Sequence, residues 1–441
     1  MIHPDTMTVA ETKADASVET TAAQHGGRCP FSSVAQEFNP FADSYQNDPY
    51  DFYRRARQEE PVFYSPKFDA WIVTRYADVS AVLRDSKNFI KPGFGISRLP
   101  IVPEAKAILD AEYHFVPTFA DDDSGLHRQL RSWLAKALHS PRFAASVYEP
   151  KIRALTVESI ADFDFSEPVD LVRELAIPVS IGISLQLLGV PEEYSDRIME
   201  WNVNFQRFIG GRLDSTEQVA GARILAAHWA FCVQHVAQMR QNLGDDLTSE
   251  LLRFSERCVP PIATRQIEST IFALSFATSF NTIIVLVNGL RILLSRPEIW
   301  QALHRNPDLI PNVVEEILRF DSSVPVIPLI ATSENAIGGV KIPVGATVLL
   351  SLSSSGRDEN VFEQPDEFDI HRKNARKHLA FSAGLHVCVG ARFARLELQT
   401  VLRLLTSCFP HMRLVAGQHF EWTKNMFWRD LQKLLVEVDA R

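Results

Sequence analysis

The sequence predicts a mainly α-helical domain with small β-sheets and a long helix buried at its centre, and three observations support this fold class. The pattern from about residue 125 to 320 is mostly helical, with breaks at Pro141, Pro191 and Pro260-Pro261. Within it, residues 271–290 form a run of twenty residues without a charge. Two shorter stretches, 61–74 and 324–352, are β-rich instead.

Local signals predict the N-terminal elements in turn. Residues 48–58 are expected to form a helix with Pro49 near its start, where the missing N–H of proline is tolerated. Residues 61–64 and 70–74 are expected to be the two strands of a hairpin. Residues 76–89 are expected to return to helix.

Length and composition indicate one large domain. The 441 residues, 46% of them apolar, can bury a large core, and no Gly/Ser-rich linker or low-complexity break divides residues 41–441. Residues 1–40 are expected to be a flexible leader, because their first part is rich in Thr, Ala, Ser and charge and lacks the apolar core of a signal peptide. The net charge of −9 argues against general nucleic-acid binding, which needs a basic face.

The charge-free run 271–290 is long enough to span a bilayer. Polar side chains are nevertheless spread over several of its faces, and Arg291 follows at once, so we expect a helix buried in a soluble, cytoplasmic protein. Five cysteines are scattered without CxxC pairs, which argues against a disulfide framework or a zinc site and fits a reducing cytosol.

The most informative stretch is the loop 381–390, Phe-Ser-Ala-Gly-Leu-His-Val-Cys-Val-Gly, which places Cys388 between glycines and opens an apolar helix. Gly384 and Gly390 let the backbone approach a large flat ligand, and the first N–H groups of the helix favour an anionic sulfur. A low-pKa thiolate of this kind is a metal ligand or a nucleophile, and a buried structural cysteine is the third possibility. A nucleophile would need His386 as its base, although neighbours two residues apart usually diverge in a loop.

This loop resembles the haem-binding signature of the cytochrome P-450 family, Phe-Gly-x-Gly-x-His-x-Cys-x-Gly followed by Ala-Arg-x-Glu. The matching positions are Phe381, Gly384, His386, Cys388, Gly390, Ala394, Arg395 and Glu397, with mild departures at Ser382 and Phe393. The likeness covers about residues 41–441. It implies the cytochrome P-450 fold, with the long central helix over the haem, and Cys388 as the thiolate ligand of haem b. It also places Phe381, Gly384, His386 and Gly390 against the cofactor.

The resemblance extends to cations that would bind the haem propionates. His127-x-x-x-Arg131 spaces two donors one helical turn apart, at positions that hold propionates in the family. His378 stands where the family commonly has a third donor. In the second sheet, Leu329 occupies a position where the family often has an arginine, so a propionate is either less well neutralised or served by another group.

A further motif implies structural support for the haem loop. Glu316-Ile-Leu-Arg319, in a helix that Pro311 can begin, matches the family's Glu-x-x-Arg, and Arg372 supplies the arginine to which that pair locks. Taken alone, the pair could equally be a solvated surface contact. We assign these three residues to support and not to chemistry.

The central helix departs most from the family, which usually carries there an acid and an alcohol that guide protons to the bound oxygen. Phe280 takes the acid's position, and Asn281 takes that of the alcohol. An amide can donate a hydrogen bond and hold a water, but it does not titrate. Protons would then run through water, the substrate or neighbouring hydroxyls. A register shifted by one residue would instead make Thr282 the working alcohol.

Together the resemblance implies a soluble bacterial-type haem-thiolate monooxygenase that inserts one oxygen atom of O₂ into a hydrophobic small molecule, with electrons from a separate ferredoxin. The basic run 371–378, with Arg128 and Arg392, predicts a docking surface for that partner. The candidate pocket segments are largely apolar: 90–117, 324–328 and 425–427. Two alternatives stay open: a peroxide-driven peroxygenase, because the acid–alcohol pair is missing, and a haem-based binding or sensor protein that never turns over.

Overall fold

The computed structural model describes residues 32–437 apart from 94–96, 98, 122–124 and 165. The α-helices of this part are α1 Ser33–Glu37, α2 Asp43–Asn47, α3 Tyr50–Glu59, α4 Tyr76–Arg84, α5 Pro103–Glu112, α6 Gly125–Leu138, α7 Ala145–Ala161, α8 Ile177–Leu188, α9 Ser195–Gly210, α10 Ser215–Gln241, α11 Leu247–Glu256, α12 Thr264–Ala277, α13 Phe280–Leu294, α14 Pro297–Arg305, α15 Ile310–Phe320, α16 Leu352–Ser355 and α17 Ala391–Cys408. The strands are β1 Val62–Ser65, β2 Ala70–Val73, β3 Phe89–Ile90, β4 Val169–Asp170, β5 Val326–Ala331, β6 Asn335–Ile337, β7 Val340–Ile342, β8 Thr347–Ser351, β9 Arg413–Leu414 and β10 Leu435–Glu437.

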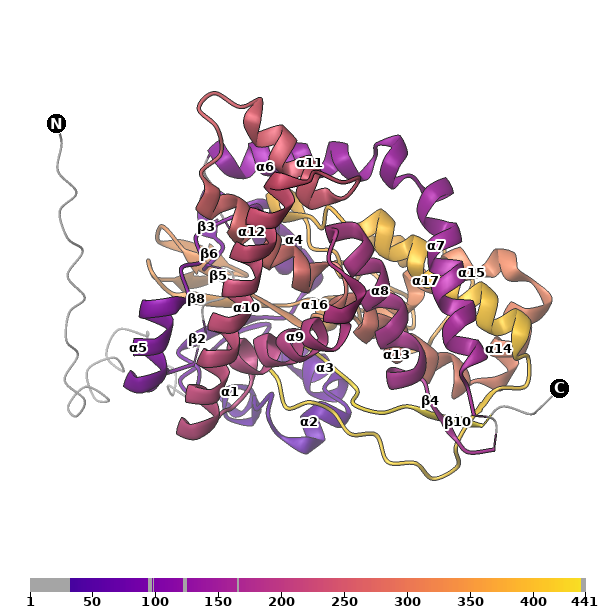
Figure 1. Cartoon of the computed structure of the whole chain (residues 1–441). Coiled ribbons are helices and arrows are strands. Elements are labelled where there is room, and N and C mark those ends of the chain that lie inside the picture. The colour runs from indigo at the N-terminus through magenta and orange to yellow at the C-terminus, as the bar shows by residue number, and fades with distance from the viewer. Residues whose placement is uncertain (1–31, 94–96, 98, 122–124, 165, 438–441) are drawn as a thin grey trace.

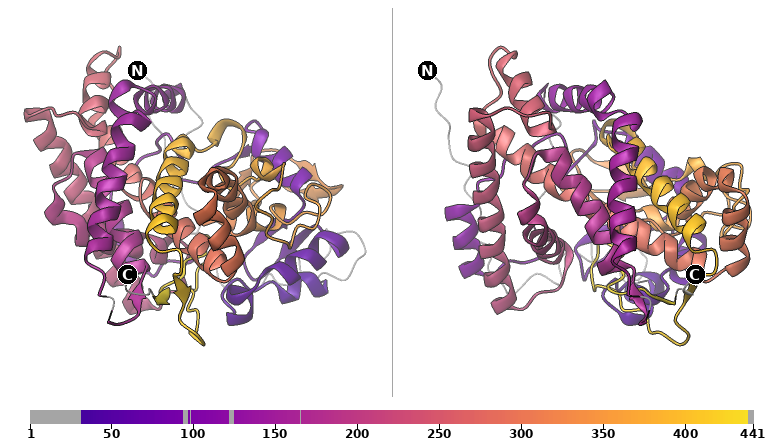
Figure 2. Two further views of the ribbon diagram at one scale, coloured as in Figure 1. Left: turned by 90° about the vertical axis from the view of Figure 1, so that its right-hand side faces the viewer. Right: turned by 45° about the vertical axis from the view of Figure 1, so that its right-hand side comes forward.

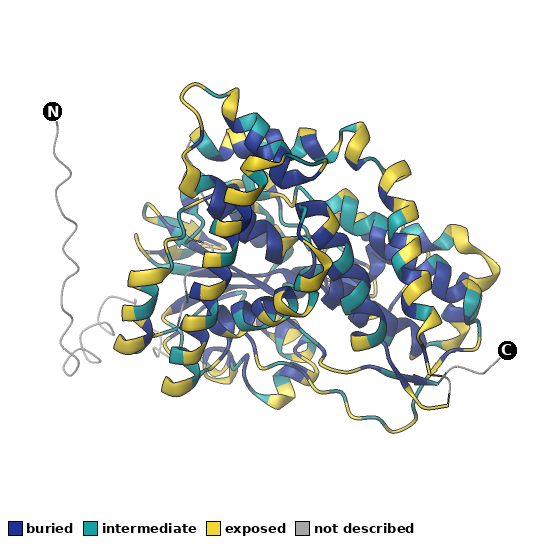
Figure 3. Cartoon of the chain, in the orientation of Figure 1, coloured by how far each residue is buried: buried dark blue, intermediate teal, exposed yellow. Residues whose placement is uncertain are grey.

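Helices dominate the molecule and the sheets are small, as the sequence predicts. In Figure 1 the large sheet lies to the left and α7, α14, α15 and α17 to the right, with α13 between them. Helices α7 and α17 run side by side in both views of Figure 2. Figure 3 shows the dark blue buried residues on the faces that the helices turn toward one another, as expected of amphipathic helices around one core.

The largest sheet joins the two β-rich stretches of the sequence. Its strand order is β1-β2-β8-β5-β3, with β2 and β8 parallel and the other pairs antiparallel. The predicted hairpin is β1 and β2, and the β-rich stretch 324–352 supplies β5 and β8. Residues almost three hundred positions apart thus form one sheet beside the cysteine loop.

The expected leader is too long at its C-terminal end. Ser32 caps α1 by accepting a hydrogen bond from the backbone N–H of Ala35, and the side chains of Val34 and Phe38 are buried in the core. Since these residues pack into the domain, the packed domain includes residues before 41. Residues 1–31 of the expected leader lie outside the described part of the chain.

The expected helix 76–89 is also too long. Helix α4 ends at Arg84, and Phe89 joins the sheet in β3. The reason is local: the carboxylate of Asp85 accepts hydrogen bonds from the backbone and the side chain of Asn88, which offers the backbone an alternative to the helical ladder.

The long central helix is present as Thr264–Leu294, interrupted at Thr278 and Ser279, where α12 gives way to α13. This helix is apolar enough to cross a membrane, but 83% of its most apolar window is buried inside the protein. The interruption contains neither proline nor glycine. The hydroxyls of Thr278 and Ser279 donate to the carbonyls of Leu274 and Ser275 four residues back, a pattern that bends helices.

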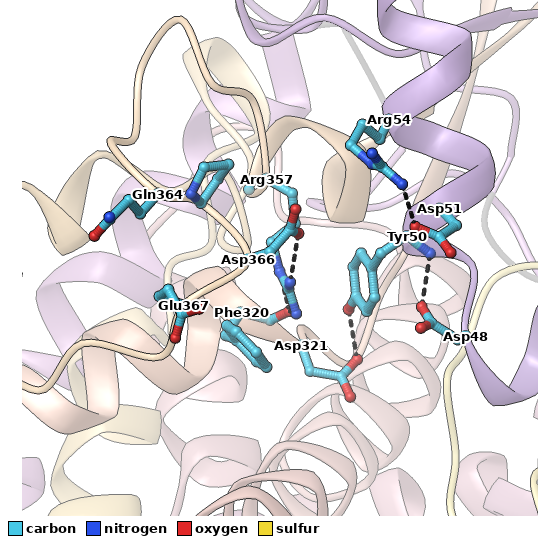
Figure 4. A network of polar contacts seen from close by, with 12 residues as sticks. Asp48, Tyr50, Asp51, Arg54, Phe320, Asp321, Arg357, Gln364, Asp366 and Glu367 are labelled. Carbon is cyan, nitrogen blue, oxygen red and sulfur yellow. Dashed lines mark hydrogen bonds and ion pairs between the residues drawn. The ribbon is translucent and has the colours of Figure 1, made fainter.

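A polar network fastens the N-terminal helix α3 to the end of α15 (Figure 4). The Tyr50 hydroxyl donates to Asp321 at 2.9 Å, and the Arg357 guanidinium lies over the rings of Tyr50 and Phe320. Arg357 also donates to the Phe320 carbonyl and pairs with Asp366 at 2.9 Å. The network holds the segment after β8, which leads toward the cysteine loop, against both helices.

Candidate active site

The cysteine loop is folded back on itself just before α17 and packs against α4. The backbone N–H of Cys388 donates to the carbonyl of Phe381 at 2.8 Å, which closes the loop at its base. Gly384 has a φ of +69°, and a Cβ there would clash with the backbone oxygen of Leu83. Gly390 has a φ of −80°, and a Cβ there would make only an ordinary contact of 3.9 Å with the Cys388 sulfur. The conformational need for glycine therefore exists at Gly384 and not at Gly390.

The sulfur of Cys388 has mixed electrostatic surroundings. Burial raises the pKa of its thiol, whereas the backbone N–H groups of Gly390 and Ala391 and the cations Arg131 and Arg395 act in the opposite direction. The start of α17 thus favours the anion, as the sequence predicts, but the expectation of a low-pKa thiolate is not met by the protein alone. A coordinated metal cation would deprotonate the thiol outright.

A cavity of about 330 Å³ lies between the cysteine loop and the central helix, which is within the usual size range of small-molecule sites. Cys388, Phe381 and Gly390 line it from the loop, and the surface that Cys388 exposes faces this cavity. Among the described cysteines, Cys388 alone lines it. Its apolar lining includes Phe119, Leu134, Leu138, Leu187, Leu274, Val285, Val324, Ile327 and Leu398.

The residues present fit a haem. The cavity walls carry two permanent cations, Lys91 and Arg131, together with His386, and no carboxylate among the described lining residues. An apolar slot with a thiol on one wall and an excess of positive charge suits a flat, apolar, dianionic cofactor with a metal at its centre. No group of three or more potential metal-ligating His, Cys, Asp or Glu side chains occurs in the described part of the chain.

The two expected propionate donors on α6 lie at this site. Arg131 lines the cavity and donates a hydrogen bond to the Val387 carbonyl of the cysteine loop. Burial lowers the pKa of Arg131, and the nearby Cys388 opposes that shift. His127 is buried, and its ring packs edge-on against His386 with centroids 4.6 Å apart. Helix α6 is therefore held against the cysteine loop, and the propionate role of both donors stays a prediction.

The third expected donor, His378, lies elsewhere. Its ring nitrogens interact with Glu315 at 3.1 Å and with the backbone N–H of Ala380 at 3.1 Å, and the side chain is buried and absent from the cavity lining. We therefore correct its expected role as a propionate donor. Nε2 of His378 already pairs with the carboxylate of Glu315, and Nδ1 accepts from Ala380, so neither ring nitrogen is left to bind a propionate.

Glu315 is a supporting residue that the sequence analysis missed. It accepts hydrogen bonds from Arg395 on α17 at 2.6 and 2.8 Å in addition to its contact with His378. Burial would raise the pKa of Glu315, but the hydrogen bonds from His378 and Arg395 prevail and lower it to about 2. The carboxylate thus ties α15 to both sides of the cysteine loop. Its one signal in the sequence is an acid on the apolar face of a helix.

The expected support triad is assembled. Arg319 pairs with Glu316 through two contacts of 2.7 Å, and Arg372 reaches the same carboxylate at 3.0 Å, all three side chains being buried. The two guanidinium groups also donate to backbone carbonyls between residues 356 and 367. A buried, fully hydrogen-bonded network of this kind fixes the chain that leads into the cysteine loop.

The interruption of the central helix opens onto the cavity. Thr278, Asn281 and Thr282 all line it, whereas Phe280 is buried in the core. Both candidate positions for a proton-delivering group therefore face the same space, and the register between Asn281 and Thr282 stays a prediction.

Trp428 fixes the orientation of the Asn281 amide. The indole N–H donates to Asn281 Oδ1 at 3.1 Å. An indole nitrogen is only a donor, so the amide oxygen must face it and the amide NH₂ is left as a donor for other partners. Trp428 is itself held by Asn425, whose side-chain oxygen accepts from the backbone N–H groups of Phe427 and Trp428.

Comparison with known proteins gives a consistent result. The Cytochrome P450 family model matches residues 217–413. Nocardicin C N-oxygenase of Nocardia uniformis subsp. tsuyamanensis is 32% identical over 90% of this chain and 97% of its own length. The structure of cytochrome P450 CREJ in complex with (4-ethylphenyl) dihydrogen phosphate superposes with a TM-score of 0.87 at 30% identity, covering 92% of this chain and all of that one. An intact type IV self-sufficient cytochrome P450 monooxygenase gives 0.86 at 34% identity, over 93% of this chain and 54% of that one.

Proposed function

The chain belongs to the cytochrome P450 family, and from this premise we propose that Cys388 is the axial thiolate of its haem b and that the cavity above it is the place of oxidation. The family consists of haem-thiolate monooxygenases, so the protein is an oxidoreductase with haem b as cofactor. The observation that carries the assignment is the position of Cys388, on a glycine-bounded loop that faces the central helix across the cavity. The bound haem would supply the chemistry of O₂ activation, favoured by electron donation from the sulfur.

The proposed cofactor contacts follow from the cavity wall. Phe381, Gly390 and His386 line the cavity together with Arg131 and would surround the haem. Gly384 acts less directly, because it lets the loop dock on the end of α4. His127 does not line the cavity, but its ring packs against His386, which does, and we propose that it binds a propionate there.

Asn281 is our proposed proton-delivery group, with Thr282 as the alternative. With its oxygen held by Trp428, the Asn281 Nδ2 can donate a hydrogen bond to a water in the cavity. The amide cannot itself release a proton, so it would position the water through which the proton moves. Thr282 could serve instead through a hydroxyl that both donates and accepts.

The proposed substrate is a hydrophobic small molecule. Apolar side chains make up most of the cavity wall, and they come from α6, α8, α17, the central helix and the segment 324–327. Of the three pocket segments expected from the sequence, 90–117 and 324–328 contribute described lining residues, whereas 425–427 does not. The CREJ structure holds (4-ethylphenyl) dihydrogen phosphate, a small molecule that joins an apolar aromatic part to a phosphate. A screen of small apolar compounds for a shift of the haem Soret band would identify binders directly.

We propose that the electrons come from a separate ferredoxin-type partner in the cytoplasm, docked on a basic surface. Two basic residues of the run 371–378, Arg372 and His378, are buried and do not contribute to that surface. The exposed cations of the proposed surface are Lys373, Arg376, Lys377, Arg128 and Arg392. Positive charge in a chain of net charge −9 would steer an acidic partner to this face.

Peroxide-driven oxygenation is the second candidate function. It is favoured because the described lining residues of the cavity include no carboxylate that could guide protons to bound oxygen. One experiment separates the candidates. A compound that shifts the Soret band is incubated with the haem-loaded protein and either NADH with a ferredoxin system or H₂O₂ alone. We expect product with NADH and O₂. Product with H₂O₂ alone would favour the peroxygenase, and no product in either arm would favour a binding or sensor protein.

A further inference from the structure

The walls of the cavity contain a cation for which the sequence analysis found no role. A haem presents two propionates, and Leu329 occupies the position where the family often supplies an arginine for one of them. Leu329 is buried in the large sheet opposite Val348 on β8. It therefore offers no charge, and another group must face that carboxylate if it is to be neutralised.

Strand register brings Lys91 to the position of the missing arginine. Strands β3 and β5 are neighbours in the large sheet, and they pair with Phe89 opposite Ala331 and Ile90 opposite Ile330. Lys91 is the first residue after the strand, and extending this antiparallel register by one step would bring it opposite Leu329. Side chains of directly opposed residues lie on the same face of a sheet. Lys91 lines the cavity, as does Ile327, which is two positions from Leu329 on β5 and therefore on its face.

The charge balance of the cavity points the same way. Lys91 and Arg131 are the two permanent cations of the described lining, and they come from different elements, the segment after β3 and helix α6. Two cations match the two carboxylates of a haem in number. A hydrogen bond between an ammonium group and a carboxylate is charge-assisted, and it gains strength where water is partly excluded.

We propose that Lys91 binds a haem propionate and compensates from the neighbouring strand for the leucine at position 329. The assignment rests on the proposed function, because it requires that the cavity holds haem. Lys91 is thus a cofactor-binding residue supplied by the segment that follows the edge strand β3, instead of by β5.

The test measures haem retention and not turnover. Haem-loaded protein is mixed with excess apomyoglobin, and the rate of haem transfer is followed for wild type, Lys91→Met, Lys91→Arg and a control, Lys87→Met. Lys87 is an exposed lysine four residues earlier, outside the cavity lining, so its variant loses the same charge without facing the site. We expect Lys91→Met to lose haem about tenfold faster, as the loss of one charge-assisted hydrogen bond implies. Lys91→Arg and Lys87→Met should behave like wild type.

Reconstitution with haem dimethyl ester tests whether Lys91 acts through a propionate, because the ester has no free carboxylates. With the ester, wild type and Lys91→Met should lose the cofactor at equal rates. A rate for Lys91→Met equal to that of wild type with ordinary haem would overturn the assignment, as would a difference that persists with the ester. A different result would show that Lys91 recognises an anionic substrate instead. Lys91→Met would then keep its haem, a fatty acid would no longer shift its Soret band, and the matching alcohol still would. Failure of the proposed function would be distinguishable, since wild type itself would then lack the thiolate-type spectrum of its reduced CO complex.

Discussion

Replacing Gly384 by alanine tests how the cysteine loop is held. The glycine has a φ of +69°, and an added Cβ would lie against the backbone at the end of α4, including the Cα of Arg84 at 2.9 Å and the carbonyl oxygen of Leu83. Both neighbours are main-chain atoms, so neither can turn aside as a flexible side chain could. Either the loop or the end of α4 must move.

The expected cost follows from two contributions. The left-handed conformation costs an L-residue about 1–2 kcal/mol, and an extra carbon forced into a packed site costs about 1–3 kcal/mol. Alanine also makes the unfolded chain less flexible than glycine does, which stabilises the folded state by about 0.4–1 kcal/mol and offsets part of this cost. The net loss is therefore about 1–5 kcal/mol. The unfolding entropy is about 2.1 cal/mol/K per residue, so for 441 residues each kcal/mol lowers the thermal midpoint by about 1 °C, and the expected fall is about 1–5 °C.

Gly390→Ala is the matched control, because it makes the same change in the same loop. Its φ of −80° suits alanine, and the added carbon would meet only the Cys388 sulfur at an ordinary 3.9 Å. We expect Gly384→Ala to lower both the thermal midpoint and the haem content per chain, and Gly390→Ala to fold with a midpoint like that of wild type. A Gly384→Ala protein with unchanged midpoint and full haem would refute the reasoning about the close approach to α4.

Three further predictions concern proton delivery, partner docking and a buried acid. Asn281→Ala should consume NADH at a normal rate but release more peroxide and less product, because losing one hydrogen-bonding group near developing charge costs at most about 2.7–4 kcal/mol of stabilisation. Thr282→Ala should have a mild effect. The measurement is product formed per NADH oxidised, and the opposite ranking of the two variants would mean that Thr282 is the working residue. Charge reversal at the exposed Lys373 and Lys377 should slow haem reduction by ferredoxin at low ionic strength, and equal rates would exclude this surface. Burial raises the pKa of Glu397 to about 7, so the folded state binds a proton that the unfolded state has released, and stability falls as pH rises from about 4.5 to 7. Urea unfolding should show a fall of up to about 3 kcal/mol across that range for wild type, and a Glu397→Gln variant with the same pH dependence would contradict this.

Local features of the chain were sufficient to predict a mainly α-helical fold with small sheets, whereas the roles of the site residues came from the resemblance to the family. Apolar periodicity and proline positions predicted the helical body, and the hairpin 61–74 followed from two short β-rich runs. The glycines around Cys388 predicted a loop that faces a large ligand, which agrees with the cavity found there. The pairing of Glu316 with Arg319 also followed from spacing alone, because residues three apart share one face of a helix.

What could not be predicted depends on contacts between distant parts of the chain. The role of Glu315 requires knowing that α17 and His378 meet at its carboxylate, and the orientation of Asn281 depends on Trp428, 147 residues away. The interruption at Thr278 and Ser279 escaped notice, since two hydroxyl residues in a helix do not by themselves predict a break. A basic residue such as His378 has the same appearance in a sequence whether it faces a propionate or a buried glutamate.

The ligation of haem by Cys388 is the central claim, and the absorption spectrum of the reduced, CO-bound protein tests it most directly. Wild type should show the red-shifted Soret band that thiolate ligation gives. In Cys388→Ser that band should be lost, while far-UV circular dichroism remains helical. An imidazole-type spectrum in wild type, or a thiolate-type band that survives in Cys388→Ser, would contradict the assignment.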